Sequence, residues 1–113
     1  MKIGELSRRT SVSRDTIRLY ERLGMLNEIS RPFEWNTYKD YGEANVKRIR
    51  CIKYMQRFSF KLKEIKEVFD AKDANPNQCV DKSNIFKSKL QVIEQEIGEL
   101  NKTRDALIDI INH

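Results

Sequence analysis

The stretch SVSRDTIRLYERLGML, residues 11–26, is the strongest structural signal in the chain. Its Ser13 can cap a helix N-terminus, because a serine oxygen accepts a hydrogen bond from a backbone amide of the first turn. Ile17 and Tyr20 follow at helical spacing, and Gly24 is a residue type that commonly ends a helix. The pattern predicts the turn and second helix of a helix-turn-helix, the helix that lies in the major groove when such a unit binds DNA.

Several side chains of this region and of the segment after it can contact DNA. Arginine and threonine donate hydrogen bonds to phosphate oxygens, and arginine also addresses guanine in the major groove. The candidate DNA-contact residues are Arg14, Thr16, Arg18, Tyr20, Arg31, Tyr38 and Lys39. For Tyr20 two interpretations stay open, a DNA contact and packing in the core, whereas Tyr41 is expected to pack.

The segment after the helix predicts a wing. Residues 26–42 are rich in aromatic side chains and partly alternate, which is typical of a short hairpin, and Arg31-Pro32 interrupts any helix. The hairpin turn is expected near Asn36-Thr37. Together with a short first helix, these elements predict a winged helix-turn-helix domain over residues 1–75.

Two further helices are expected in this domain. One runs from about residue 43 to 57 and carries a basic outer face, and one from about residue 62 to 69. The breaker cluster Asn75-Pro76-Asn77 then marks a domain boundary. Cys51 lies on the apolar stripe of the first of these helices and is interpreted as a small buried hydrophobic residue.

Residues 79–113 form a second predicted domain, a single helix from about residue 80 to 112. Its apolar side chains step by four and three residues, the heptad pattern of a coiled coil, with one interruption at Arg104. The candidate dimer-interface residues are Phe86, Leu90, Ile93, Ile97, Leu100, Leu107 and Ile111. A helix of this length is expected to bury its seam against a second copy of the chain, and the alternative is a helix folded back on its own domain.

The charge distribution supports the same division into a DNA-binding domain and a dimerisation helix. Of the 22 Lys and Arg residues, 16 lie in residues 1–70, where only 10 of the 17 acidic residues are found. A basic part followed by a near-neutral tail favours a polyanion-binding module joined to a protein-binding element. No apolar run approaches the roughly 20 residues of a membrane span, and no signal peptide is visible. We therefore expect no membrane partner and a cytoplasmic location with reduced thiols.

No residue constellation points to catalysis. The chain has one histidine, at position 113, no Gly-rich phosphate loop and no convincing nucleophile and base. The protein is therefore not expected to be an enzyme.

Four fragments in order and at matching spacing resemble the MerR family of bacterial transcription regulators. They are IGELS at 3–7, TIRLYE at 16–21, NTYKDY at 36–41 and FKLKEI at 60–65. The resemblance implies a mainly α-helical homodimer, with a winged helix-turn-helix domain followed by a long helix that pairs antiparallel. It further implies binding to a palindromic promoter whose spacer DNA is distorted, so that RNA polymerase is affected indirectly through DNA shape.

The chain departs from the family pattern at a few places. Leu19 stands where the family has the first tyrosine of a pair, and Thr37 where a turn glycine is usual. Lys39 replaces the commoner arginine. Such changes affect the preferred DNA sequence rather than the fold.

Cys79 is the candidate metal ligand. In the metal-sensing branch of the family a cysteine at this place binds soft divalent ions, which thiolates hold well. One cysteine per subunit makes a poor closed site, and His113 of the partner subunit could add a nitrogen ligand only if antiparallel pairing brings it close. Two alternatives to a plain promoter regulator therefore remain. One is a soft-metal sensor that uses Cys79, and the other, of a different class, is an excisionase-like architectural or recombination-accessory protein, which usually lacks the heptad helix.

Overall fold

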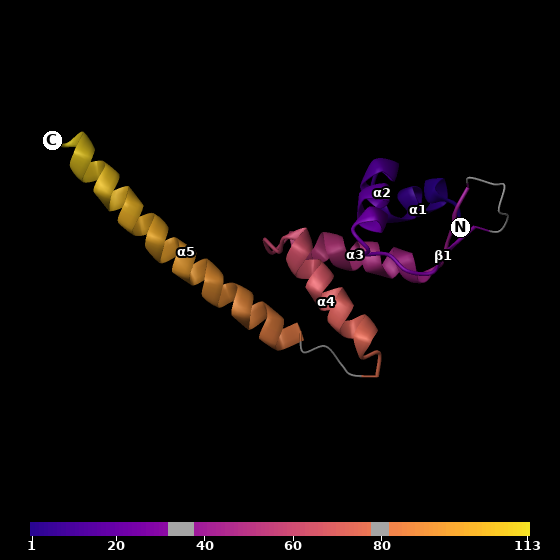
Figure 1. The fold of residues 1–113 in the computed structure, drawn as a ribbon. Coiled ribbons are helices and arrows are strands. Elements are labelled where there is room, and N and C mark those ends of the chain that lie inside the picture. The colour runs from indigo at the N-terminus through magenta and orange to yellow at the C-terminus, as the bar shows by residue number, and fades with distance from the viewer. Residues whose placement is uncertain (32–37, 78–81) are drawn as a thin grey trace. The chain divides into compact units, whose positions relative to one another are not determined.

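The computed structural model describes residues 1–31, 38–77 and 82–113, and the chain divides into two compact units, Met1–Gln78 and Cys79–His113. The elements of the first unit are α1 (Ile3–Thr10), α2 (Arg14–Arg22), β1 (Ile29–Ser30), β2 (Asp40–Tyr41), α3 (Ala44–Gln56) and α4 (Leu62–Ala74). The second unit contains α5 (Lys82–Ile111) (Figure 1).

The α1–turn–α2 segment forms because its local residues satisfy the helix ends. Ser11 adopts the left-handed conformation, with φ of 57°, which ends α1. The Ser13 hydroxyl oxygen accepts a hydrogen bond from the Thr16 amide at 3.1 Å, as the capping pattern predicts. At the other end of α2, Gly24 has φ of 75°, and the Met25 amide donates to the Tyr20 carbonyl at 2.9 Å. This paired arrangement at a left-handed glycine is a Schellman C-cap, so both predicted ends of the helix are confirmed.

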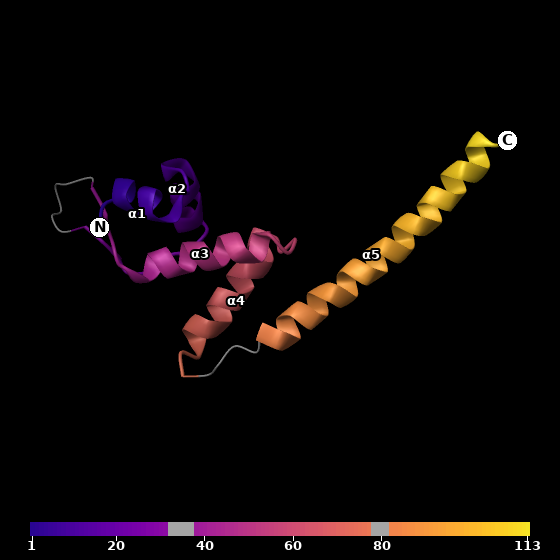
Figure 2. The ribbon, with the colours of Figure 1, turned by 180° about the vertical axis from the view of Figure 1, so that it is seen from behind.

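The core of the first unit joins all of its helices. The fully buried apolar side chains are Leu6, Ile17, Met25, Ile49, Ile52 and Ile65. Removal of this apolar surface from water is the main favourable contribution to the stability of the unit. In Figure 2, the view from behind, α4 crosses α3, and Phe69 of α4 is also buried.

Two polar side chains of α3 hold the residues between α2 and β1 against this helix. Asn45 is completely buried; its side-chain oxygen accepts from the Asn27 amide at 3.0 Å and its side-chain nitrogen donates to the Asn27 carbonyl. Arg48 donates to the Met25 carbonyl at 2.8 Å. These bonds satisfy backbone groups that have no partner within a helix or strand.

The predicted wing pairs as an antiparallel hairpin. Ile29 faces Tyr41 and Ser30 faces Asp40 across the two strands. The Tyr41 amide also donates to the Met1 carbonyl at 2.7 Å, so the N-terminus lies beside β2. Tyr41 is buried, as expected. The predicted turn at Asn36-Thr37 lies outside the described residues.

The fourth helix is longer than predicted. The apolar pattern predicts an end near Phe69, but α4 continues to Ala74, with Asn75 as its C-cap. The last turn consists of exposed residues and therefore carries no apolar signal. Ion pairs of Lys66 with Asp70 at 2.7 Å and of Arg48 with Asp73 accompany this extension.

The second unit is the predicted long helix. α5 has 30 residues, and none of them is buried in the single chain. Along the heptad seam Leu90, Ile97 and Leu100 are 53–68% exposed, and Ile111 is 78% exposed. An apolar stripe of this kind on a helix favours a protein partner. Over the described ranges, no helix has the length and apolar character needed to cross a membrane.

Candidate nucleic-acid interface

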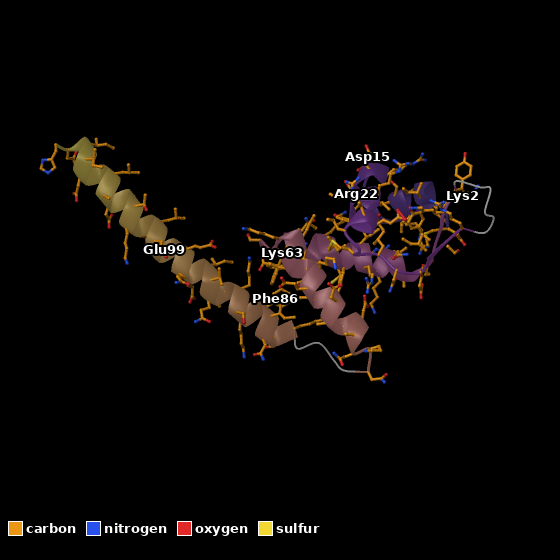
Figure 3. All side chains as sticks on the ribbon, in the orientation of Figure 1. Lys2, Asp15, Arg22, Lys63, Phe86 and Glu99 are labelled. Carbon is orange, nitrogen blue, oxygen red and sulfur yellow. The ribbon has the colours of Figure 1, made fainter. Side chains whose placement is uncertain are left out.

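An open hollow of about 590 Å³ lies between the start of α1, one side of α2 and residues 38–41, which we call the β2 segment. We call it the basic hollow. Its lining residues are Lys2, Ile3, Arg14, Arg18, Glu21, Arg22, Tyr38, Lys39 and Tyr41. Five of these side chains are cations and one is a carboxylate, so the surface carries a strong positive charge that suits a polyanion. Figure 3 labels Lys2 just before α1 and Arg22 near the end of α2.

The cations of α2 form a stripe along one side of the helix. Arg14, Arg18 and Arg22 are spaced by four residues, and all three are exposed. Arg18 donates to the Asp15 carboxylate at 3.0 Å, a pair in which both side chains remain more than half exposed. Such an exposed pair holds the arginine only weakly, so the guanidinium can turn to another anion.

The Arg14 guanidinium lies over the start of α1. A methyl group placed on Gly4 would be 2.8 Å from its Nη2 atom, so the missing side chain at Gly4 leaves room for it. Thr16 is in the first turn of α2, and its hydroxyl lies 2.8 Å from that of Ser13. The structure thus brings the predicted Arg14 and Arg18 together in the basic hollow, whereas Thr16 lies on another side of α2 and does not line it.

The wing residues divide into two kinds. Tyr38 is 64% exposed, and the Lys2 ammonium lies 5.1 Å from the centre of its ring, a cation–π contact. Arg31 is exposed but is not part of the hollow. Lys39 turns inward, and its ammonium donates to both oxygens of Glu21 at 2.7 and 2.9 Å.

Tyr20 belongs to the core and not to the interface. Its side chain is only 4% exposed, because it follows Ile17 on the face of α2 that packs inward. Burial raises the pKa of its hydroxyl, as expected for a phenol removed from water. Of the two interpretations of Tyr20, the structure therefore favours core packing, and the prediction of a DNA contact is corrected.

Tyr41 is a buried residue that lines the basic hollow. Burial is the main cause that raises the pKa of its hydroxyl. The charge of Glu21 and a hydrogen bond to that carboxylate act in the same direction, while Arg18 opposes them.

Three charged residues of the hollow were not predicted from the sequence, namely Lys2, Glu21 and Arg22. For Arg22 a signal exists, since it continues the four-residue spacing of Arg14 and Arg18.

The candidate metal ligand Cys79 lies outside the described residues. Within the described ranges, no group of three or more His, Cys, Asp or Glu side chains is arranged to hold a metal ion. Cys51 is partly exposed, rather than fully buried as its pattern predicts.

Known proteins resemble this chain in sequence and in fold. The model of the MerR HTH family regulatory protein matches residues 1–72, and the model described as MerR, DNA binding matches residues 46–110. The mercuric resistance operon regulatory protein of Serratia marcescens is 32% identical over 98% of this chain and 74% of its own length.

Two solved structures have the same fold. One is the transcription regulator PbrR691 from Ralstonia metallidurans CH34 in complex with lead(II), with a TM-score of 0.80, 24% identity, and coverage of 96% of this chain and 83% of that one. The other is HiNmlR, a MerR family regulator bound to promoter DNA, with a TM-score of 0.64, 16% identity, and coverage of 93% and 78%. The family-model matches together with the helix-turn-helix, its wing and the long helix show that this chain belongs to the MerR family of DNA-binding transcription regulators and is not an enzyme.

Proposed function

We propose that the chain binds promoter DNA as a homodimer and regulates transcription by distorting the spacer between the two polymerase recognition elements. The basic hollow supports this most directly, because it places Lys2 and the three arginines of α2 on one concave surface. Phosphate contacts of such a surface would orient the protein on the duplex, and base contacts from α2 would select the site.

Three described residues are proposed to make the main contacts. Arg14 and Arg18 are exposed on the N-terminal half of α2, where a recognition helix reaches base edges and phosphates. Tyr38 offers a largely exposed side chain on the wing side. Thr16 and Arg31 are proposed as additional phosphate contacts, and Lys39 as a neighbour of the interface whose ammonium is held by Glu21.

The dimer is proposed to form through the seam of α5. Its apolar side chains are exposed along several turns, whereas a stable helix of a globular protein covers such a stripe. Two copies related by a two-fold axis would present two α2 helices to two half-sites, which explains a palindromic target. RNA polymerase would respond to the changed DNA shape, and the regulator would act in the cytoplasm. Membership of this family disfavours the excisionase-like alternative.

The test uses the full chain and the duplex that it selects from a randomised DNA library. We expect a dimer by light scattering at micromolar concentration and a two-fold symmetric footprint on that duplex. Arg14→Ala should weaken binding about 5- to 100-fold, whereas the control Lys102→Ala, an exposed cation of α5, should not. A monomer with no symmetric footprint, or equal binding by the two variants, would contradict the proposal.

A soft metal ion is the second candidate, as the signal to which the regulator responds. The match to a mercuric resistance regulator over nearly the whole chain favours it, and Cys79 is the ligand that the sequence offers. Because two thiolates per dimer make an incomplete site for a four-coordinate ion, we expect at best weak binding of such an ion through Cys79. Titration with Cd²⁺ should show weak binding that is lost in Cys79→Ser and kept in Cys51→Ser. Binding that survives in Cys79→Ser would reject Cys79 as the ligand.

A further inference from the structure

The carboxylate of Glu21 lies in a position that its charge alone does not explain. Among the described residues that line the basic hollow it is the single anion, so it subtracts from the positive charge that would attract DNA. It is also well covered, with its side chain only 18% exposed. A surface built only to collect positive charge would have no use for this residue.

The contacts of Glu21 join two parts of the interface that are distant in sequence. Its two oxygens accept hydrogen bonds from the Lys39 ammonium at 2.7 and 2.9 Å, 18 residues along the chain. Tyr41 lines the same hollow as this carboxylate, and the pKa of its hydroxyl is raised by burial, which is the larger cause, and by the charge of Glu21. Glu21 is in α2, whereas Lys39 and Tyr41 belong to the β2 segment, so the carboxylate ties this segment to the recognition helix.

The Lys39 ammonium is held more firmly than the Arg18 guanidinium. The side chain of Lys39 is 33% exposed. In the exposed pair of α2, the side chain of Arg18 is 56% exposed and that of Asp15 is 95% exposed. Charge-assisted hydrogen bonds in a partly dry site are stronger than the same bonds in water. Lys39 is therefore held by Glu21, and Arg18 is free to turn toward an incoming phosphate.

We propose that Glu21 and Lys39 act together as a positioning pair, which fixes the β2 segment against α2 so that Tyr38 and the α2 arginines meet DNA at the same time. This inference rests on the proposed binding of DNA. It assigns Lys39 a role within the protein in place of a phosphate contact. It also predicts that Glu21 strengthens binding to DNA, although its negative charge alone would weaken that binding.

The sign of the effect separates positioning from simple electrostatics. Glu21→Gln removes a negative charge from the basic hollow, so electrostatics alone predicts tighter binding to DNA. If the carboxylate positions the β2 segment, Glu21→Gln weakens binding instead, by about two- to fivefold for a pair of this exposure. The matched control is Asp15→Asn, the exposed carboxylate on the same helix, which should bind DNA as tightly as the wild type or more tightly.

The salt dependence gives a second, independent readout. Each phosphate contact contributes about 0.9 to the slope of log K against log salt concentration. Lys39→Gln should therefore weaken binding about as much as Glu21→Gln while keeping the wild-type slope, and the double variant should be no weaker than either single variant. Lys39→Arg, which retains the cation and its donors, should restore binding.

The experiment measures the affinity of the full chain for its selected duplex by fluorescence anisotropy at several salt concentrations, with thermal unfolding of each variant as a check on folding. Tighter binding by Glu21→Gln, or a slope reduced by about 0.9 in Lys39→Gln, would overturn the inference while leaving the proposed function intact. If the wild type binds no duplex, the proposed function fails instead. If Glu21→Gln is unfolded at the assay temperature, the inference is tested by the other two variants. It then requires a wild-type salt slope for Lys39→Gln and wild-type DNA affinity for Lys39→Arg.

Discussion

Replacement of Arg48 by methionine tests how the DNA-binding unit holds its recognition helix. Arg48 is on α3, and its side chain is 12% exposed. One end of its guanidinium donates to the Met25 carbonyl just after α2, and another nitrogen pairs with Asp73 at the end of α4. The same group lies 4.8 Å from the ring centre of Phe69. Arg48 thus connects the end of α2 to α3 and α4.

The magnitude follows from these contacts. A hydrogen bond from a charged donor to a buried carbonyl contributes about 1.5–3 kcal/mol, and a cation–π contact about 0.5–2 kcal/mol when it is shielded from water. Methionine keeps the apolar stem, and the contributions are not additive, so we expect a loss of about 2–3 kcal/mol in the free energy of unfolding. For a unit of this size that corresponds to a fall in Tm of about 10–20 °C.

The assay is thermal and urea unfolding of the full chain, followed by circular dichroism at a fixed protein concentration, because dimerisation makes Tm depend on concentration. The matched control is Arg50→Met on the same helix. Arg50 is exposed, and its one hydrogen bond within the described part of the chain is a long one of 3.4 Å to the Arg9 carbonyl. The Tm of the Arg50→Met variant should therefore change by only about 2 °C. Equal Tm values for the two variants would refute the reasoning, since they would show that the buried contacts of Arg48 add no stability.

Three further predictions address binding and assembly. Arg18→Ala should weaken binding to the selected duplex and lower the salt slope by about 0.9 if Arg18 contacts one phosphate; an unchanged affinity and slope would exclude that role. Gly4→Ala should raise Tm slightly, because alanine is the better helix former, yet weaken DNA binding, because the new methyl group would meet the Arg14 guanidinium at 2.8 Å; a variant that binds DNA like the wild type would show that the position of Arg14 is unimportant. Arg104→Leu should make the dimer more resistant to dilution in analytical ultracentrifugation, since a charged residue in a coiled-coil seam reduces its stability, and a weaker dimer would show that Arg104 contributes a favourable contact across the seam.

Local features of the first unit could be predicted because they depend on neighbouring residues. Ser13 caps α2 and Gly24 ends it in the structure as the pattern indicates. The heptad spacing in the same way predicts one long helix with an exposed apolar seam. The last turn of α4 was missed, since exposed residues up to Ala74 give no apolar period.

The candidate site was predicted only in part. Arg14 and Arg18 could be grouped from the sequence because they are four residues apart on one helix. The burial of Tyr20 could not be decided, because a tyrosine suits both a core and a DNA surface. Lys39 carries the same charge whether it faces solvent or a carboxylate, and its sequence position does not reveal which.

The sequence by itself determined the helix-turn-helix, the wing pairing and the seam of α5, because capping, turn residues and periodicity act within a few residues. Only the tertiary structure decided which charges share a surface. Glu21 and Lys39 meet because the β2 segment packs beside α2, and Arg48 reaches Met25 because α3 lies under the end of α2. Such contacts depend on how whole elements pack around the common core, because packing brings together partners that are distant in sequence and shields them from water, which strengthens their interaction.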